Sequence, residues 1–164
     1  MKPTIPLLIV VALVASAGRA HAQSTESKKT LTLEGAKAIA AAAAAEAKRG
    51  NEGGSIAIVD DGGNLMYLER IQPTFPMGAT ISTEKARTAA LFQKPTKILE
   101  DAIVRGRTPL LNVWSAPLNG GEPIVVDGQV VGAIGVSGAS TAARDAAIAL
   151  AGAAALGSKN SATR

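Results

Sequence analysis

The chain contains no cysteine, a single histidine, and only one Trp, one Tyr and two Phe among 164 residues. Without cysteine it can form no disulfide bond. The histidine, His21, lies in a segment that we expect to be removed, so the mature chain would have neither imidazole nor thiol. This excludes a zinc or copper site built from the usual nitrogen and sulfur ligands. It also excludes Ser-His-Asp and Cys-His catalysis within one chain.

The amino terminus has the organisation of a secretory signal peptide. Lys2 gives a positive start, residues 6–18 form an apolar run, and the Ala-His-Ala of residues 20–22 is a small-x-small cleavage pattern. We therefore expect residues 1–22 to be a signal peptide and the mature protein to be periplasmic or secreted; an uncleaved anchor is the alternative. The apolar run is shorter than the roughly 18 residues of a membrane span, and no later segment reaches that length.

The charge balance gives no indication of a nucleic-acid partner. The 17 basic residues, less Lys2 and Arg19, stand against 13 acidic ones, which leaves a net charge of +2. The sequence contains no stripe of clustered basic residues, which a nucleic-acid-binding surface would require, so we expect no nucleic-acid partner. We expect a flexible segment over 23–30, a single domain over 31–157 and a disordered tail over 158–164.

Turn residues and hydrophobic patterning predict the order helix, hairpin, two helices, hairpin, helix. Alanine-rich sequence predicts the first and last helices, β-branched runs predict strands, and the Asp-Gly pairs at 61–62 and 127–128 predict the turns. The expected helices cover 33–49, 80–94, 95–104 and 143–156, and the expected strands cover 54–60, 64–70, 123–126 and 129–138. The fold class is therefore α+β, with an antiparallel sheet made from two hairpins and packed by helices.

Three glycines, Gly132, Gly135 and Gly138, interrupt the last predicted strand. Their GxxGxxG spacing after a hairpin does not fit the dinucleotide fingerprint, and the segment lacks the lysine of a Walker loop, so we expect no nucleotide. Because strand side chains alternate faces, Gly132 and Ile134 should share one face and Gly135 the other. Glycines on both faces of a strand allow the backbone of another segment to approach it closely. We expect the first and last helices, whose apolar stripes are made of alanine, to pack closely on the sheet in this way.

Four segments together resemble the GlcG/HbpS family, which also supplies the C-terminal domain of PduO-type corrinoid adenosyltransferases and is described as haem-degrading or haem-binding. They are residues 55–70, 84–96, 119–140 and the final helix. The resemblance implies a profilin-like domain that forms homo-oligomers, and in some relatives a pocket for haem or a corrinoid. No agreed catalytic reaction belongs to the family.

The resemblance also implies positions for the ligand pocket. Carried over residue by residue, they are Arg70, Lys85, Thr88, Phe92, Gly120, Gly121, Glu122, Pro123, Ser137 and Gly138. The chain departs from its relatives after Arg70, where IQPTFPMGA replaces Met-Asp-Gly-Ala. Since histidine ligation is excluded in the mature chain, a haem iron would depend on Tyr67, Met77 or a water, with Met66 expected to face a core.

Lys85 and the paired glycines each leave two interpretations open. Lys85 has apolar residues four positions before and after it, so it either binds an anionic group such as a propionate or carboxylate or is a solvated cation. Gly120 and Gly121 either offer backbone N–H groups to an anion or form a loop that must be thin. Trp114 either shields an apolar ligand or covers an oligomer interface.

Two functions follow from these residues. The first is a secreted, oligomeric binding protein for a tetrapyrrole or a small carboxylated metabolite, with a pocket near a subunit interface. The second is an enzyme acting on a small hydroxy- or oxo-acid, with Glu122 as acid–base group and Lys85 or Arg70 as its electrostatic partner. No catalytic constellation is recognisable, because Glu122 is a single carboxylate without a partner of defined spacing.

Overall fold

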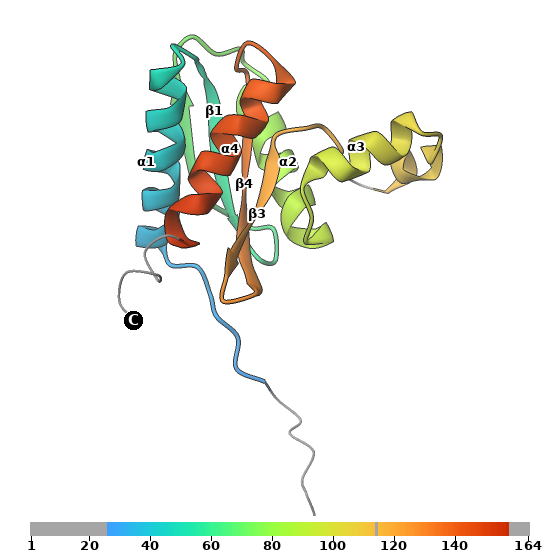
Figure 1. Cartoon of the computed structure of the whole chain (residues 1–164), viewed down its shortest axis with the longest axis horizontal. Coiled ribbons are helices and arrows are strands. Elements are labelled where there is room, and N and C mark those ends of the chain that lie inside the picture. The colour runs from blue at the N-terminus through green and yellow to red at the C-terminus, as the bar shows by residue number, and fades with distance from the viewer. Residues whose placement is uncertain (1–25, 114, 158–164) are drawn as a thin grey trace, which may run out of the picture.

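The computed structural model describes residues 26–113 and 115–157 (Figure 1). The expected signal peptide, Trp114 and the expected tail over 158–164 lie outside the described residues. In chain order the elements are α1 (Leu33–Arg49), β1 (Gly54–Asp60), β2 (Leu65–Ile71), α2 (Gly78–Phe92), α3 (Thr96–Val104), the 3-10 helix η1 (Thr108–Asn112), β3 (Gly121–Val126), β4 (Gln129–Ser137) and α4 (Ala142–Gly157). The predicted order is confirmed. The short helix η1 lies between α3 and β3 and is not among the helices expected from the sequence.

The strands form one antiparallel sheet in the order β2-β1-β4-β3. Each predicted hairpin is present, and β1 pairs with β4 to join them, with Ala57 opposite Gly135. Strand β3 begins at Gly121, two residues earlier than the sequence suggested, because Gly121 continues the ladder opposite Gly135. Glu122 therefore lies inside a strand instead of in the turn before it.

The sheet separates two helical layers (Figure 1). Helices α1 and α4 cover one face and bury the larger core, which includes Ile39, Ile58, Ile134 and Ile148. Helix α2 covers the other face over a core of valine and alanine side chains. The segment with α3 and η1 projects from these layers beside β3 (Figure 1). Within the described ranges, no helix has the length and hydropathy needed to cross a bilayer.

The glycines of β4 determine how closely α2 approaches the sheet. A Cβ atom on Gly135 would lie 2.5 Å from the backbone N of Ala86 and still closer to the backbone O of Ser82. Gly132 and Ile134 face the α1 and α4 side, so the predicted alternation is confirmed. The helix that uses Gly135 is α2, however, and not one of the alanine-rich helices. Those helices share the opposite face and also pack on each other, where a Cβ on Gly152 would lie 3.1 Å from Ala43 Cβ.

The caps of α1 and α4 follow from the sequence, whereas that of α2 does not. Thr32 Oγ1 accepts a hydrogen bond from Gly35 N at 3.1 Å, and Thr141 Oγ1 accepts one from Arg144 N at 3.1 Å. Helix α2 begins at Gly78, after Met77, and has no side-chain cap. Thr80 and Ser82, which lie at the expected start of this helix and could cap it by residue type, are inside the helix, because the loop after β2 is shorter than the sequence suggested.

Candidate functional site

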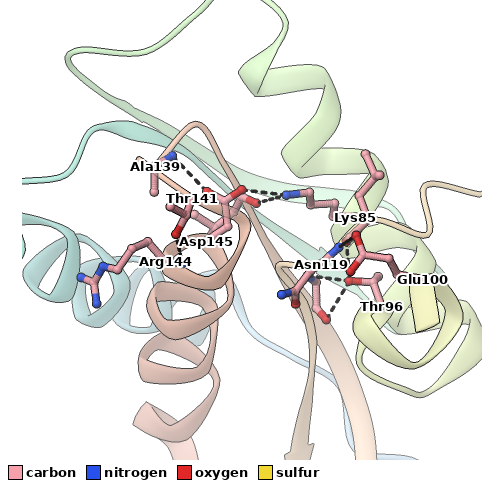
Figure 2. Close-up of polar contacts among 11 residues, drawn as sticks. Lys85, Thr96, Glu100, Asn119, Ala139, Thr141, Arg144 and Asp145 are labelled. Atoms are coloured by element: carbon pink, nitrogen blue, oxygen red, sulfur yellow. Dashed lines mark hydrogen bonds and ion pairs between the residues drawn. The ribbon is translucent and has the colours of Figure 1, made fainter. Parts of the chain in front are cut away.

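Lys85, in the middle of α2, carries an ammonium group that is buried and paired. Its side chain is 4% exposed, and Nζ donates to Asp145 Oδ2 on α4 at 2.9 Å and to Val136 O on β4 at 2.8 Å (Figure 2). Asp145 Oδ1 also accepts a hydrogen bond from Ala139 N at 3.0 Å. Lys85 is therefore not a solvated cation, and its charge is balanced from within the chain.

The paired glycines at the start of β3 make room for this ion pair. A Cβ on Gly120, where φ is +114°, would lie 2.9 Å from Asp145 Cβ and 3.0 Å from Lys85 Nζ. A Cβ on Gly121 would lie 2.5 Å from Lys85 O and 2.6 Å from Thr96 Cγ2. The N–H of Gly121 donates to Thr96 Oγ1 at 2.9 Å, so it is not offered to an anion. Of the two interpretations, the thin loop is the one that these contacts support.

A second set of hydrogen bonds fastens the long connection beside the glycines. Thr96 Oγ1 donates to Leu118 O at 2.6 Å, and Glu100 Oε1 accepts from Asn119 N at 3.3 Å (Figure 2). Thr88 Oγ1 on α2 accepts from Ala116 N at 2.8 Å. The hydroxyl group of Thr88 thus holds the connection in place.

Glu122 is a buried carboxyl group on the opposite side of the sheet from α2. Its neighbour in the ladder is Ile134, which belongs to the core under α1 and α4, and the side chain is 6% exposed. Burial raises the pKa of Glu122 from 4.5 to about 7. Among the described residues, none donates a hydrogen bond to this carboxyl group. A carboxyl with a pKa near neutrality is suited to proton transfer.

The cations named as partners for Glu122 do not lie beside it. Arg70 is exposed on β2, at the other edge of the sheet, and its ladder neighbour Ser55 faces α2. Lys85 is held by Asp145. The structure therefore does not assemble Glu122, Arg70 and Lys85 into one acid–base site.

The end of β2 and the loop that follows it expose three side chains that a ligand can reach. Arg70 is exposed at the end of β2, Phe75 is 42% exposed, and Met77 is 55% exposed immediately before α2. A Cβ on Gly138 would lie 3.3 Å from the ring of Phe75, which brings the end of β4 next to this loop. We call Arg70, Phe75 and Met77 the β2–α2 loop cluster.

The other candidate haem ligands lie on the far face of the sheet. Met66 and Tyr67 pack against the core under α1 and α4. The Tyr67 hydroxyl group donates to Glu69 Oε2 at 3.4 Å. Met77 is therefore the most exposed of the three candidates.

The positions implied by the resemblance are distributed over four parts of the described structure. The amino-terminal end of α2 is close to Arg70, Ser137 and Gly138, and the start of β3 brings together Lys85, Gly120 and Gly121. The face of the sheet that α2 covers also carries, farther along, Thr88, Phe92 and Pro123. The opposite face, covered by α4, carries Glu122. The sequence missed Asp145, since one acidic residue in the first turn of a helix is explained by the helix dipole alone.

Two hollows of the described residues lie away from Lys85 and Gly121. One, of 430 Å3, lies near the start of α1, and its apolar lining includes Leu31, Val131 and Leu156. The other, of 280 Å3, lies between β2 and α2; it is lined by Leu68, Ala79, Thr80, Thr83 and Glu84, and we call it the β2–α2 hollow. Within the described part of the chain, no group of three His, Cys, Asp or Glu residues could hold a metal ion.

The fold and these residues define a member of a known class: the chain belongs to the HbpS-like family, whose model, described as "Haem degrading protein HbpS-like", matches residues 31–154. Among individual relatives, it is 47% identical to protein GlcG of Escherichia coli strain K12 over 113 residues, which are 68% of this chain and 84% of GlcG. The resemblance seen in the sequence is thereby confirmed.

Solved structures show the same architecture. A double mutant of Streptomyces reticuli HbpS superposes with a TM-score of 0.74 at 31% identity, covering 92% of this chain and 99% of that protein. The crystal structure of a PduOC:heme complex superposes with a TM-score of 0.69 at 23% identity, covering 77% of this chain and 95% of that one. The latter likeness shows the fold alone.

Proposed function

We propose that the mature chain is a periplasmic or secreted homo-oligomer that binds haem or a related tetrapyrrole. The observation that carries this proposal is membership of a family whose model is described as haem-degrading. The PduOC:heme complex, in which a chain of the same fold is combined with haem, gives further support. A small carboxylated metabolite is the alternative ligand.

The β2–α2 loop cluster offers the groups that such a ligand requires. A Met thioether is an axial ligand of haem iron in proteins, and Met77 is the most exposed of the candidates. Phe75, two positions before Met77, adds an exposed apolar side chain. Arg70 is an exposed guanidinium group, which binds carboxylates such as the haem propionates. Bound haem would supply the iron centre, while the chain would supply the thioether, the apolar contact and the cation.

Binding is favoured over catalysis on a small acid, because Glu122 has no cationic partner of the kind that the catalytic hypothesis named. Lys85 is occupied by Asp145, and Arg70 lies at the opposite edge of the sheet. The β2–α2 loop cluster combines two exposed apolar side chains, Phe75 and Met77, with one exposed cation, Arg70, which suits a planar hydrophobic ligand that carries carboxylates.

Titration of the purified mature chain with hemin tests this proposal. We expect a shifted Soret band at micromolar hemin, and Met77→Ala should weaken binding about ten-fold or more. Tyr67→Phe is the matched control, because it removes the other candidate ligand and should leave the spectrum unchanged. The absence of a Soret shift for the unmodified chain would rule out the tetrapyrrole and leave the small carboxylate.

A further inference from the structure

One end of the sheet face that α2 covers carries a row of three polar side chains, one from each of three neighbouring strands. Arg70 on β2 is the ladder neighbour of Ser55 on β1, and Ser55 is the ladder neighbour of Ser137 on β4. Because side chains alternate along a strand, Ser137 lies on the same face as Gly135, which lies against α2. The core farther along this face consists of alanine and valine side chains, so the polar row is distinct from it.

Both serine side chains of this row are buried. Ser55 is 0% exposed, and its hydroxyl group lies 3.4 Å from Thr74 Oγ1. Ser137 is 4% exposed, and its hydroxyl group has no hydrogen-bond partner among the described residues. Buried polar side chains almost always have a partner, because leaving one unpaired costs free energy. The hydroxyl group of Ser137 is therefore a donor that a ligand can use.

Helix α2 begins against this row and adds two further donors. A Cβ on Gly78 would lie 3.0 Å from Ser55 Oγ and 3.0 Å from Thr74 Oγ1. The helix has no side-chain cap, and the N–H groups of Ala79 and Thr80 have no acceptor among the described residues. The first N–H groups of a helix carry partial positive charge and bind anions.

Arg70 adds a full positive charge to these donors. Its guanidinium group is exposed and has no ion-pair partner within the described ranges. The adjacent Glu69 lies on the other face of the sheet, since its ladder neighbour Ile56 belongs to the core under α1 and α4. Arginine binds carboxylates through paired hydrogen bonds, and one cation matches the single charge of a carboxylate better than the double charge of a phosphate.

We propose that Ser137, Arg70 and the first N–H groups of α2 form a binding site for a carboxylate group, which we call the α2 carboxylate site. Ser137 Oγ and the two helix N–H groups donate hydrogen bonds to the carboxylate oxygens, and the guanidinium group balances the charge. The carboxylate belongs either to a haem propionate or to a free small acid. The site needs no iron ligand, so it does not depend on haem binding.

Free propionate, which corresponds to the side chain of haem, tests the site without haem. The melting temperature is measured while propionate replaces chloride at constant ionic strength, which gives an apparent dissociation constant. We expect a saturable rise for the unmodified chain. Ser137→Ala should raise the dissociation constant about ten-fold, because a hydrogen bond to a charged group contributes about that factor. Arg70→Gln, at an exposed position, should weaken binding in the same way without affecting the fold.

Two control variants match these changes. Ser82→Ala removes another fully buried hydroxyl group, which already donates to Ala79 O at 3.0 Å. Lys48→Gln removes an exposed cation in the last turn of α1. Both controls should titrate as the unmodified chain does, and circular dichroism checks that every variant is folded.

Hemin and its dimethyl ester distinguish the two sources of the carboxylate, because the ester has no charged propionate. If a haem propionate occupies the site, hemin should bind more tightly than the ester, and Ser137→Ala should remove the difference. If a free acid occupies it, only the response to propionate should depend on Ser137. A Ser137-dependent response to propionate without any Soret shift would leave the α2 carboxylate site in place and remove haem. Titrations with propionate and hemin that are the same in the unmodified chain, Ser137→Ala and Arg70→Gln would overturn the proposal.

Discussion

Lys85 on α2 reaches Asp145 on α4 across the thickness of the sheet, with 2.9 Å between Nζ and Oδ2 (Figure 2). The two helices lie on opposite faces, and the side chain passes the start of β3 where Gly120 and Gly121 carry no Cβ. One ion pair thus connects both helical layers to the end of β4.

Breaking this pair should destabilise the domain strongly. Removing one partner of a buried ion pair leaves an uncompensated charge and costs about 3–5 kcal/mol. We therefore expect Lys85→Met and Asp145→Asn each to lower the free energy of unfolding by about that amount, as measured by urea denaturation. The double variant should lose much less than the sum of the two, and strict additivity would show that the pair is not coupled.

Replacing Gly135 by alanine should disrupt the packing of α2 on the sheet. The added Cβ would meet the backbone of Ser82 and Ala86, which cannot move like the end of a flexible side chain. Overpacking of this kind costs about 1–3 kcal/mol or more. Gly62→Ala is the control, because its nearest neighbours are the side chains of Asn64 and Asp60. Equal thermal stabilities of the two variants would contradict the close approach of α2.

Glu122 should make the stability of the domain depend on pH. Its pKa is about 7 in the folded chain and near 4.5 when unfolded, so the folded state binds the proton more tightly. The stabilising contribution is therefore complete below pH 4.5, decreases as the pH rises, and is lost above pH 7. The total corresponds to about 3 kcal/mol. Urea denaturation at several pH values should show a smaller dependence in Glu122→Gln, whereas an unchanged dependence would place the titrating group elsewhere.

The elements of the fold could be predicted because their determinants are local. Asp127-Gly128 specifies a hairpin turn, Thr32 caps a helix, and alternation along β4 puts Gly135 and Ile134 on opposite faces. The pairing of β1 with β4 has no local determinant, since it joins segments about 75 positions apart in the chain. The helix that lies on Gly135 could not be identified for the same reason.

The candidate site was less predictable, because the role of each of its residues depends on contacts between distant segments. The sequence left Gly120 and Gly121 with two interpretations, and the contacts with Lys85 and Thr96 from distant segments distinguish the two. Asp145 gave no indication of its role. Glu122 was singled out as an acid–base candidate, yet its burial on the side away from α2 follows from β3 beginning at Gly121.

Haem binding at the β2–α2 loop cluster is tested most directly by equilibrium titration of the mature chain and its Met77→Ala variant with hemin, followed in the Soret region. We predict a saturable Soret shift at micromolar hemin for the unmodified chain and a dissociation constant about ten-fold or more higher for the variant. Identical titration curves for the two proteins would contradict ligation by Met77, and no shift in either would contradict tetrapyrrole binding itself.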